Sequence, residues 1–410
     1  MTSDAKCRFC GGPLSEFVNL GMSPPCESFL VANQLNAMES FYPLAAYLCR
    51  DCLLVQLQEY VSPLHIFSEY AYFSAFSDSW LEHAHHYAAM MTARLGLSHE
   101  SRVIELGSND GYLLQYFVQQ GIPVLGIDPA GNVAAAAEQR GVRTLVRFFD
   151  TETARELADE GMQADLVLGN NVLAQVTDLN SFVAGIGIIL KPQGVCTIEF
   201  PHLLRTMEGN QFDQIYHEHF SYFSAMTATR IFAAHGMRLF DIQELPTHGG
   251  SLRIFACHAG DQSHPTLPAV AACIAREKQA GLHEVETYAA FAEQVRTTKC
   301  KLLSFLIEAK RRGKSVVGYG APGKGNTLLN YCGIRTDFLD YTVDRNPYKH
   351  GRFLPGTHIP IFPPDHIAET KPDYILVLPW NLIDEICAQL AYTREWGAQL
   401  VVPIPEVAVI

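Results

Sequence analysis

Short apolar segments alternate with helical patterns through the middle of the chain, and this alternation most constrains the fold. Between residues 102 and 201 the apolar segments are RVIELG, PVLGIDP, ADLVLGNN and GVCTIEFP. Strands that alternate with helices form parallel sheets, because each helix returns the chain to the start of the next strand. Two later segments, MRLFDIQEL and SLRIFACH, are joined by the turn-rich PTHGG and predict an antiparallel hairpin. We expect one sheet of six or seven strands.

The same alternation restarts near Ser315, where SVVGYGA, FLDYTVD, DYILVLPW and QLVVPIP predict a second, smaller α/β unit. A chain of 410 residues is too long for a single ordinary core. We therefore predict an α/β protein with four parts. They are a cysteine-containing module at 1–70, a Rossmann-like α/β domain at 71–262, connecting helices at 263–312 and a smaller Rossmann-like α/β domain at 313–410.

Composition narrows the range of partners. The formal net charge of −13 argues against a nucleic-acid surface, which would need a basic face to neutralise phosphates. The sequence contains no run of about 18 apolar residues, so it predicts no membrane span. The start, MTSDAKCRFC, lacks the basic and apolar regions of a signal peptide. We expect a cytoplasmic protein, a monomer, with neither nucleic-acid nor membrane partners.

Two Cys-x-x-Cys pairs lie in the first part of the chain. Each pair places two thiolates where one tetrahedral Zn²⁺ can accept both, and four sulfurs close its coordination shell. The remaining seven of the eleven cysteines are scattered singly, so a disulfide framework is disfavoured. The sequence predicts a structural zinc ion that performs no chemistry, and its ligands are Cys7, Cys10, Cys49 and Cys52.

A turn of small and polar residues, ELGSNDG, joins the strand RVI to the apolar helix YLLQYFVQQG. Such a turn lets the backbone approach a ligand, and the helix N-terminus opens toward it. Asp128 ends the next strand, where an acidic residue accepts ribose hydroxyls. Asn170 and Asn171 end a third strand at the same sheet edge. The predicted cofactor contacts are Glu105, Gly107, Asn109, Asp110, Gly111, Asp128, Asn170 and Asn171.

The turn departs from a strict dinucleotide fingerprint, because Asn109 stands where a second glycine would be. S-adenosylmethionine (SAM) carries a sulfonium and an amino acid rather than a pyrophosphate, so it does not need that tight approach. The sequence therefore predicts SAM as the cofactor of the first α/β domain.

The segment GNQFDQIYHEHFSYFS gathers two imidazoles, a carboxylate and a phenol after the strand that ends in EFP. Tyr216, His217, Glu218 and His219 could perform acid–base chemistry at neutral pH. A metal site is the rival interpretation, but His217 and His219 are two residues apart and would not share a helical face. Hydrogen-bonded core residues are the third interpretation.

The chain resembles a family, the three-domain sugar C-methyltransferases that act on nucleotide-linked 4-keto deoxysugars. The resemblance covers essentially all 410 residues, and it rests on both Cys-x-x-Cys pairs, Tyr70-Ala71-Tyr72, ELGSNDG, FDQIYHEHF, THGGSLR and VVGYGAPGKGNT. It implies that His219 is the general base, with Tyr216 and Glu218 beside it, and that the upstream catalytic tyrosine is Tyr70. One position departs from the family, because Gln175 stands where a histidine is expected.

The implied reaction is methylation at C-3 of a 4-keto-6-deoxyhexose carried by dTDP or GDP. His219 would remove the C-3 proton, Tyr216 would hold the oxyanion at O-4, and Glu218 would orient His219. The resulting enolate carbon would attack the SAM methyl group, with no metal needed. The predicted substrate contacts are Tyr72, His248, Gly249, Tyr319, Lys324 and Asn326.

The C-terminal unit contains a complete G-x-G-x-x-G, from Gly318 to Gly323, and Asp344 ends a later strand. This pattern invites an NAD interpretation, whereas Gly325 replaces the Ser or Thr that a P-loop needs for Mg²⁺. The resemblance instead assigns this unit to the nucleotide-sugar. Two alternatives stay open, an NAD-linked nucleotide-sugar oxidoreductase and a non-catalytic zinc protein that binds nucleotide-sugars.

Overall fold

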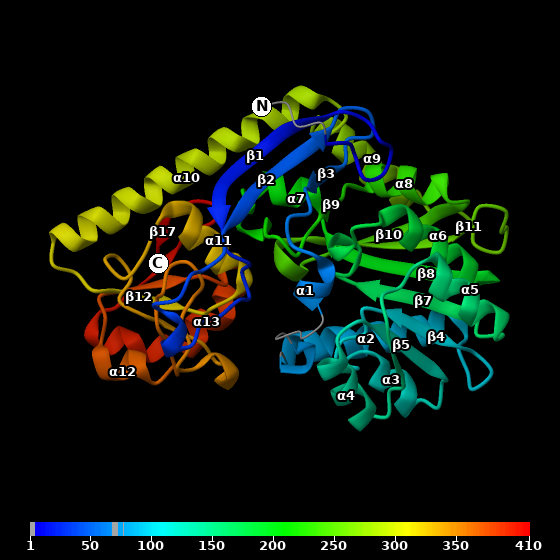
Figure 1. Cartoon of the computed structure of the whole chain (residues 1–410), viewed down its shortest axis with the longest axis horizontal. Coiled ribbons are helices and arrows are strands. Elements are labelled where there is room, and N and C mark those ends of the chain that lie inside the picture. The colour runs from blue at the N-terminus through cyan, green and yellow to red at the C-terminus, as the bar shows by residue number, and fades with distance from the viewer. Residues whose placement is uncertain (1–4, 68–72, 77) are drawn as a thin grey trace. The chain divides into compact units, whose positions relative to one another are not determined.

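A computed structural model describes residues 5–67, 73–76 and 78–410, which form two compact units (Figure 1). Each unit is assembled from separate stretches of chain. The first takes in the chain up to Leu14, Cys49–Leu203 and Glu218–His283. The second takes in Ser15–Leu48, Leu204–His217 and Glu284–Ile410. The predicted domain boundaries at 70, 262 and 312 stay predictions.

The first unit is built on a seven-stranded sheet of order β10-β11-β8-β7-β4-β5-β6 (Figure 1). Five strands are parallel, while β11 runs antiparallel to both β8 and β10. The bounds are β4 (Val103–Leu106), β5 (Val124–Asp128), β6 (Thr144–Val146), β7 (Ala164–Asn170), β8 (Leu190–Pro201), β10 (Met237–Leu245) and β11 (Ser251–His258). Beside this sheet, β3 (Val55–Leu57) pairs antiparallel with β9 (Ser221–Tyr222).

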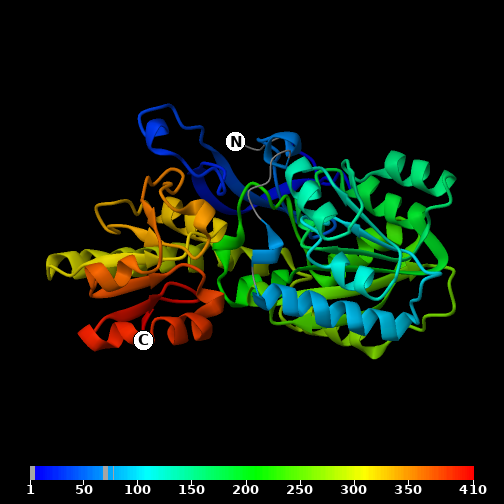
Figure 2. The same cartoon turned by 90° about the horizontal axis from the view of Figure 1, so that it is seen from below.

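Helices cover both faces of this sheet, because its strands are apolar on both sides. One core cluster joins α2 and α3 to one face, and Figure 2 shows α2 as the light-blue helix alongside the sheet. The other cluster joins α5, α6, α8 and α9 to the opposite face. The bounds are α1 (Pro63–Phe67), α2 (Asp78–Leu95), α3 (Leu114–Gln119), α4 (Gly131–Gln139), α5 (Thr151–Asp159), α6 (Leu179–Ile189), α8 (Ala225–Ala234) and α9 (Pro268–Gln279).

The second unit contains a six-stranded sheet of order β14-β13-β12-β15-β16-β17, parallel except for the edge strand β17. The ribbon of β1 and β2 also lies largely in this unit, and Phe17 of β1 stacks on Phe291 of the long helix α10. The strands are β1 (Leu14–Ser23), β2 (Tyr42–Cys49), β12 (Val316–Tyr319), β13 (Thr342–Val343), β14 (Ile361–Phe362), β15 (Tyr374–Val377), β16 (Gln399–Val402) and β17 (Ala408–Val409). The helices are α7 (Leu203–Glu208), α10 (Val285–Arg311), α11 (Gly323–Cys332), α12 (His366–Thr370) and α13 (Ile383–Gln389).

The predicted fold class is confirmed, with a cysteine cluster near the N-terminus and two mainly parallel α/β sheets. The predicted hairpin is also present, since Leu245 of β10 faces Ser251 of β11. The short strands β6, β9, β14 and β17 were not among the predicted segments, because two or three residues carry too little periodicity. Within the described residues, no helix combines the length and apolar character needed to cross a membrane.

Candidate functional site

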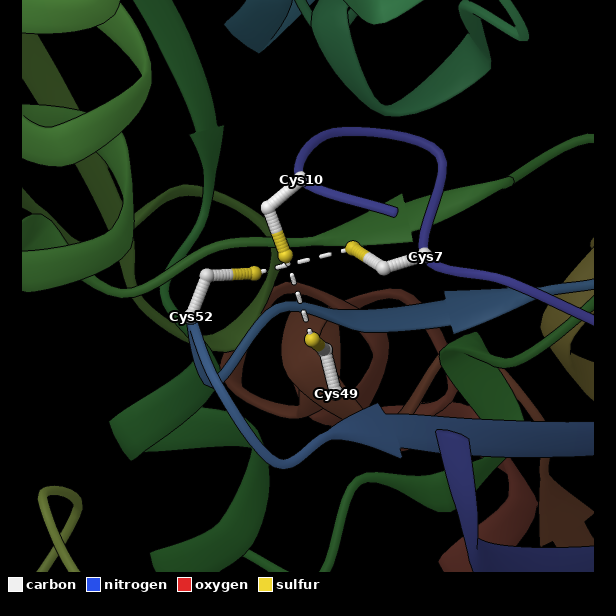
Figure 3. Close-up of side chains that lie close together, drawn as sticks. All are labelled: Cys7, Cys10, Cys49 and Cys52. Atoms are coloured by element: carbon white, nitrogen blue, oxygen red, sulfur yellow. Dashed lines mark hydrogen bonds between the residues drawn. The ribbon is translucent and has the colours of Figure 1, made fainter. Parts of the chain in front are cut away.

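The four paired cysteines converge on one point of the first unit (Figure 3). The Sγ atoms of Cys7 and Cys52 are 3.6 Å apart, and those of Cys10 and Cys49 are 3.5 Å apart. A tetrahedral zinc with Zn–S bonds of about 2.3 Å separates its sulfurs by about 3.8 Å. The four thiols therefore fit a structural Zn²⁺ with a closed coordination shell.

Neighbouring groups prepare this cluster for a cation. The side-chain amide of Gln56 donates a hydrogen bond of 3.1 Å to Cys7 Sγ, and its own oxygen accepts the backbone N–H of Arg8. Hydrogen bonding from Cys52 is the main cause that lowers the pKa of Cys7 to about 4. Gly12 is required by close packing, because a Cβ there would lie 3.1 Å from Cys49 Sγ.

A second group with metal-ligating atoms is buried in the first unit and consists of His202, Cys273 and Glu277. Its carboxylate is already occupied. Glu277 accepts hydrogen bonds from His202 Nε2 at 2.7 Å and from the backbone N–H groups of Ala225 and Met226 at 2.5 and 2.9 Å. These N–H groups open helix α8, so Glu277 caps that helix from α9. Burial raises the pKa of the Cys273 thiol to about 12, which keeps it protonated.

The predicted cofactor turn leaves β4 in the left-handed conformation that its small residues permit. Gly107, Asn109 and Gly111 have φ values of 69°, 48° and 75°. Asp128, at the end of β5, ties this turn to its own strand. Its two carboxylate oxygens accept the backbone N–H groups of Asn109 and Ala130, both at 2.9 Å.

Polar atoms around this turn are buried without partners. Ser108 Oγ, Asp110 Oδ1 and both polar side-chain atoms of Asn170 make no hydrogen bond to any residue that the structure describes. Buried polar atoms are normally satisfied, so each of these orphans indicates a missing partner. The ends of β4 and β7 thus offer hydrogen bonds to a polar ligand at the carboxyl edge of the sheet, where open α/β sheets bind cofactors.

The charge at this edge suits a cation. Burial raises the pKa of Glu105 well above its ordinary value, and the charges of Asp128 and Asp110 raise it further. Burial likewise raises the pKa of Asp110 and of Asp128. Three acids compete for protons in one place, and a sulfonium or ammonium group would relieve their repulsion. These residues fit SAM, which carries both groups.

The predicted base lies next to the segment that follows β7. Phe220 donates its backbone N–H to the carbonyl of Ala174 at 2.6 Å, so His219 is held beside the 3₁₀ turn that ends in Gln175. His219 is only 6% exposed, and its ring meets Tyr222 edge-on with centroids 6.3 Å apart. Glu218 is buried as well. Tyr216 belongs to the second unit.

His217 has a different environment. Its Nε2–H donates to the carbonyl of Pro43 at 3.2 Å, and its ring packs edge-on against Tyr42. Burial lowers the pKa of His217, so its imidazole stays neutral and keeps the Nε2 proton for this bond. His217, two residues before the predicted base in the sequence, is therefore hydrogen-bonded to strand β2 within the second unit.

Two of the predicted substrate and catalytic residues cannot be located, and two others lie in the turn after β10. Tyr70 and Tyr72 lie outside the described residues. His248 adopts a positive φ of 54°, and its Nε2 accepts a 3.2 Å hydrogen bond from the Asn171 amide. Gly249 follows it in the same turn, with φ of 87°. The turn between β10 and β11 is thus brought to the end of β7.

Comparison with known proteins connects this geometry to a family. The chain is 36% identical over 406 residues to C-methyltransferase NovU from Streptomyces niveus, covering 99% of this chain and 96% of NovU. The chain belongs to the C-methyltransferase family. Three family models match along this C-methyltransferase, a zinc binding domain at residues 7–67, a methyltransferase domain at 80–241 and a C-methyltransferase C-terminal domain at 246–405.

Two other similarities cover only part of the C-methyltransferase. A ubiquinone biosynthesis O-methyltransferase from Azorhizobium caulinodans is 32% identical over 125 residues, 30% of this chain and 47% of that protein. The crystal structure of magnesium protoporphyrin IX methyltransferase from Synechocystis with bound SAM covers 43% of this chain and 79% of its own, at 15% identity and a TM-score of 0.34. The family assignment and the fit at the sheet edge agree on a SAM-dependent methyltransferase with a zinc module.

In the second unit of the C-methyltransferase, side chains of the protein itself already bond to the G-x-G-x-x-G turn. The backbone N–H of Gly323 bonds to the Glu27 carboxylate, and a Cβ at Gly323 would lie 3.0 Å from Glu27 Oε1. Lys349 Nζ lies 3.9 Å from the other Glu27 oxygen and donates to the Ala321 carbonyl at 2.7 Å. Glu27 thus takes the position at the start of α11 where a dinucleotide fold holds pyrophosphate.

The three predicted substrate contacts of this unit also have partners within it. Tyr319 donates to Gln389, Lys324 Nζ donates to Asn381 Oδ1 at 2.5 Å, and the Asn326 amide donates to the Cys26 carbonyl at 2.6 Å. The Lys324 ammonium also lies over the Trp380 ring, 4.7 Å from its centroid.

Sequence reasoning missed Glu27 and a second carboxylate, Glu199 of β8. Glu27 follows Cys26 between two prolines and the apolar FLV, and no local pattern marks it. Glu199 is the one charged residue in the buried stretch GVCTIEF, and a charge inside an apolar strand was a usable signal. Arg253 in the SLRIFACH strand carries the same signal.

Proposed function

We propose that this C-methyltransferase methylates C-3 of a nucleotide-linked 4-keto-6-deoxyhexose through an enolate that His219 forms. The observation that carries the proposal is that buried His219 is held beside the segment that follows β7, the strand whose last residue, Asn170, has buried polar atoms without partners among the described residues. The relative that matches nearly the whole chain is a C-methyltransferase, and carbon methylation needs an acidic C–H bond and a base.

Each step follows from the acidity of a carbon next to a ketone. Neutral His219 accepts the C-3 proton, and the electron pair moves to O-4 as an oxyanion. Tyr216 donates a hydrogen bond to that oxyanion, with Tyr70 as the second phenol near the reaction. Glu218 orients His219 and stabilises its imidazolium. When bound, SAM supplies an electrophilic methyl group and leaves as S-adenosylhomocysteine.

The environment of His217 supports the choice of His219. His217 donates its Nε2–H to Pro43, which anchors this imidazole to strand β2 in the second unit and leaves its buried Nδ1 as the nitrogen with a lone pair. Gln175, in place of the family histidine, can hydrogen-bond but cannot titrate, so any acid–base duty at that position is absent or carried by another residue.

For the nucleotide, dTDP or GDP, we propose contacts from Tyr72, His248, Gly249, Tyr319, Lys324 and Asn326. Lys324 is the strongest of these for a diphosphate, because its ammonium keeps donors beyond the one bonded to Asn381. Binding there would exchange the existing intrachain hydrogen bonds for bonds to the ligand.

The test separates proton removal from methyl transfer. In deuterated water with S-adenosylhomocysteine and a panel of dTDP- and GDP-linked 4-keto-6-deoxyhexoses, the wild type should incorporate deuterium at C-3. His219→Asn should lose this exchange by about 10²–10⁴-fold, the usual contribution of a general base. With SAM present, the wild-type product should gain the mass of one methylene group.

His217→Asn is the matched control, because it alters an imidazole in the same run. It should retain exchange. Exchange that persists in His219→Asn and disappears in His217→Asn would reverse the two roles. Lack of methyl transfer to every sugar in the panel would refute the substrate class while leaving the cofactor assignment intact.

A further inference from the structure

A fully buried carboxylate, Glu199, lies near the end of β8 and is held from three directions. One carboxylate oxygen accepts hydrogen bonds from Arg253 Nη2 at 2.7 Å and from His83 Nε2 at 2.9 Å. The other accepts the Thr247 hydroxyl at 3.0 Å. These donors come from β11, from helix α2 and from the turn after β10, so a single side chain joins three elements of the first unit.

Glu199 stands directly beside the cofactor edge. In the sheet register it is opposite Arg253 of β11 on one side and opposite Asn170 of β7 on the other. Residues opposite each other in neighbouring strands project to the same face. Arg253, Glu199 and Asn170 therefore form one row, which ends at the amide whose atoms have no partner among the described residues.

One donor to Glu199, His83, belongs to a set of aromatic rings that pack together at this edge. His83 stacks on Trp80, with centroids 4.9 Å apart and planes at 16°. Trp80 in turn stacks on Tyr112, which follows the cofactor turn, and meets His248 edge-on at 5.3 Å. Trp80 is thus in contact with both segments that flank the predicted cofactor.

Thr247, a second donor to Glu199, positions another ring, that of His248, at the same sheet edge. It precedes His248, the residue with positive φ whose ring accepts the Asn171 amide. The hydrogen bond from Thr247 to Glu199 fixes the start of this turn, so it also fixes the approach of His248 to the end of β7.

The network is charged. Burial raises the pKa of Glu199, but the hydrogen bond from His83 and the charge of Arg253 more than reverse this, and the pKa is lowered overall. Glu199 is therefore an anion, and its charge strengthens all three hydrogen bonds. A neutral amide of the same shape would keep the packing and lose that strength.

We propose that Glu199 is a positioning residue for the cofactor site. Through His83 it holds Trp80, and through Thr247 it holds His248, so that both rings form walls beside bound SAM. The inference rests on the proposed placement of the cofactor at the ends of β4 and β7. It assigns a functional role to a residue that itself touches neither reactant.

The experiment compares two buried acids that tie the same helix to the same sheet. Asp241 of β10 pairs with Arg94 of α2 at 2.8 Å, as Glu199 pairs with His83 of α2. Both Glu199→Gln and Asp241→Asn should lower the thermal midpoint of the full-length protein. Only Glu199→Gln should raise the SAM dissociation constant measured by calorimetry, by about tenfold, the equivalent of one charge-assisted hydrogen bond of about 1.4 kcal/mol.

Tryptophan fluorescence provides a second readout, because the sequence has only three tryptophans and Trp80→Phe identifies the contribution of Trp80. SAM should change the Trp80 emission of the wild type and of Asp241→Asn, and should change it less in Glu199→Gln. If Glu199→Gln does not fold, Thr247→Val removes one of the three bonds and should give a smaller increase in the dissociation constant.

Equal SAM affinities for Glu199→Gln and Asp241→Asn would overturn the proposal and leave Glu199 a purely structural ion pair. Failure of the wild type to bind SAM would instead refute the cofactor placement on which the proposal rests. The two failures are therefore distinguishable.

Discussion

The two glycine turns of this C-methyltransferase have the same local design and opposite surroundings. In each, a strand leads through a glycine turn to a helix, and the aspartate that ends the next strand bonds to the turn. Asp128 accepts the N–H groups of Asn109 and Ala130, and Asp344 accepts those of Ala321 and Asn346 at 2.7 and 2.8 Å. The aspartate is thus a structural brace in both turns.

The two turns differ in whether the buried polar atoms around them have hydrogen-bond partners. Around the first turn Ser108, Asp110 and Asn170 keep buried polar atoms without partners among the described residues. Around the second, Glu27 takes the Gly323 N–H and Asn326 donates to Cys26, although Asn326 Oδ1 is left over. A glycine turn therefore indicates a cofactor site only where its surroundings leave polar groups to be satisfied.

The same rule applies to the two clusters of metal-ligating side chains, and here we expect the largest effect. The thiols of Cys7, Cys10, Cys49 and Cys52 mainly face one another, whereas Glu277 already accepts three hydrogen bonds. We expect about one zinc per chain by elemental analysis. Cys49→Ser should lose that zinc and much of the stability of the first unit, because metal binding is coupled to folding.

Cys273→Ser is the control for this prediction and should retain the full zinc content. Zinc that survives in Cys49→Ser but is lost from Cys273→Ser would mean that the buried His202 cluster is the metal site.

The next largest effect should distinguish Asp128 from Asp344 by their contributions to SAM affinity. Asp128→Ala and Asp344→Ala each remove a carboxylate that accepts two backbone N–H groups, so their structural costs should be similar. Only Asp128→Ala should weaken SAM binding, by about tenfold or more, because charge-assisted bonds to the ribose are worth about 1.5–3 kcal/mol each. Calorimetry with SAM measures this, and equal losses of affinity in both variants would break the comparison.

The smallest effect concerns Glu27. Burial raises the pKa of Glu27, and Lys349 and the Gly323 N–H offset this only in part, so the folded state disfavours the ionised carboxylate. Glu27→Gln keeps the shape of the side chain and removes that charge, so it should not lower the free energy of unfolding at neutral pH, which chemical denaturation measures. Exposed Glu395→Gln should change nothing.

A binding experiment with NADH addresses the NAD interpretation. Because Glu27 fills the pyrophosphate position, NADH should show no fluorescence change with the wild type. An NADH signal that Asp344→Ala abolishes would make the second turn a dinucleotide site after all.

Much of the fold was predictable from local sequence. The strands β10 and β11 match their predicted segments residue for residue, because each is a mainly apolar run that stops at the turn-rich PTHGG between them. The four zinc ligands were predictable too, because two Cys-x-x-Cys pairs encode one tetrahedral centre almost independently of the fold between them.

The sequence by itself determined the residue types at each turn, the strand that precedes it and the acid that follows it, because these features are encoded within a few residues. It could not show which of the two turns is filled by other parts of the chain. That distinction depends on whether distant groups satisfy the polar atoms, and Glu27 reaches Gly323 only through tertiary folding. The partners of Glu199, drawn from α2, β11 and the turn after β10, were likewise decided by packing. A buried charge is tolerated only where folding collects its counter-charges, and no local pattern records which residues those are.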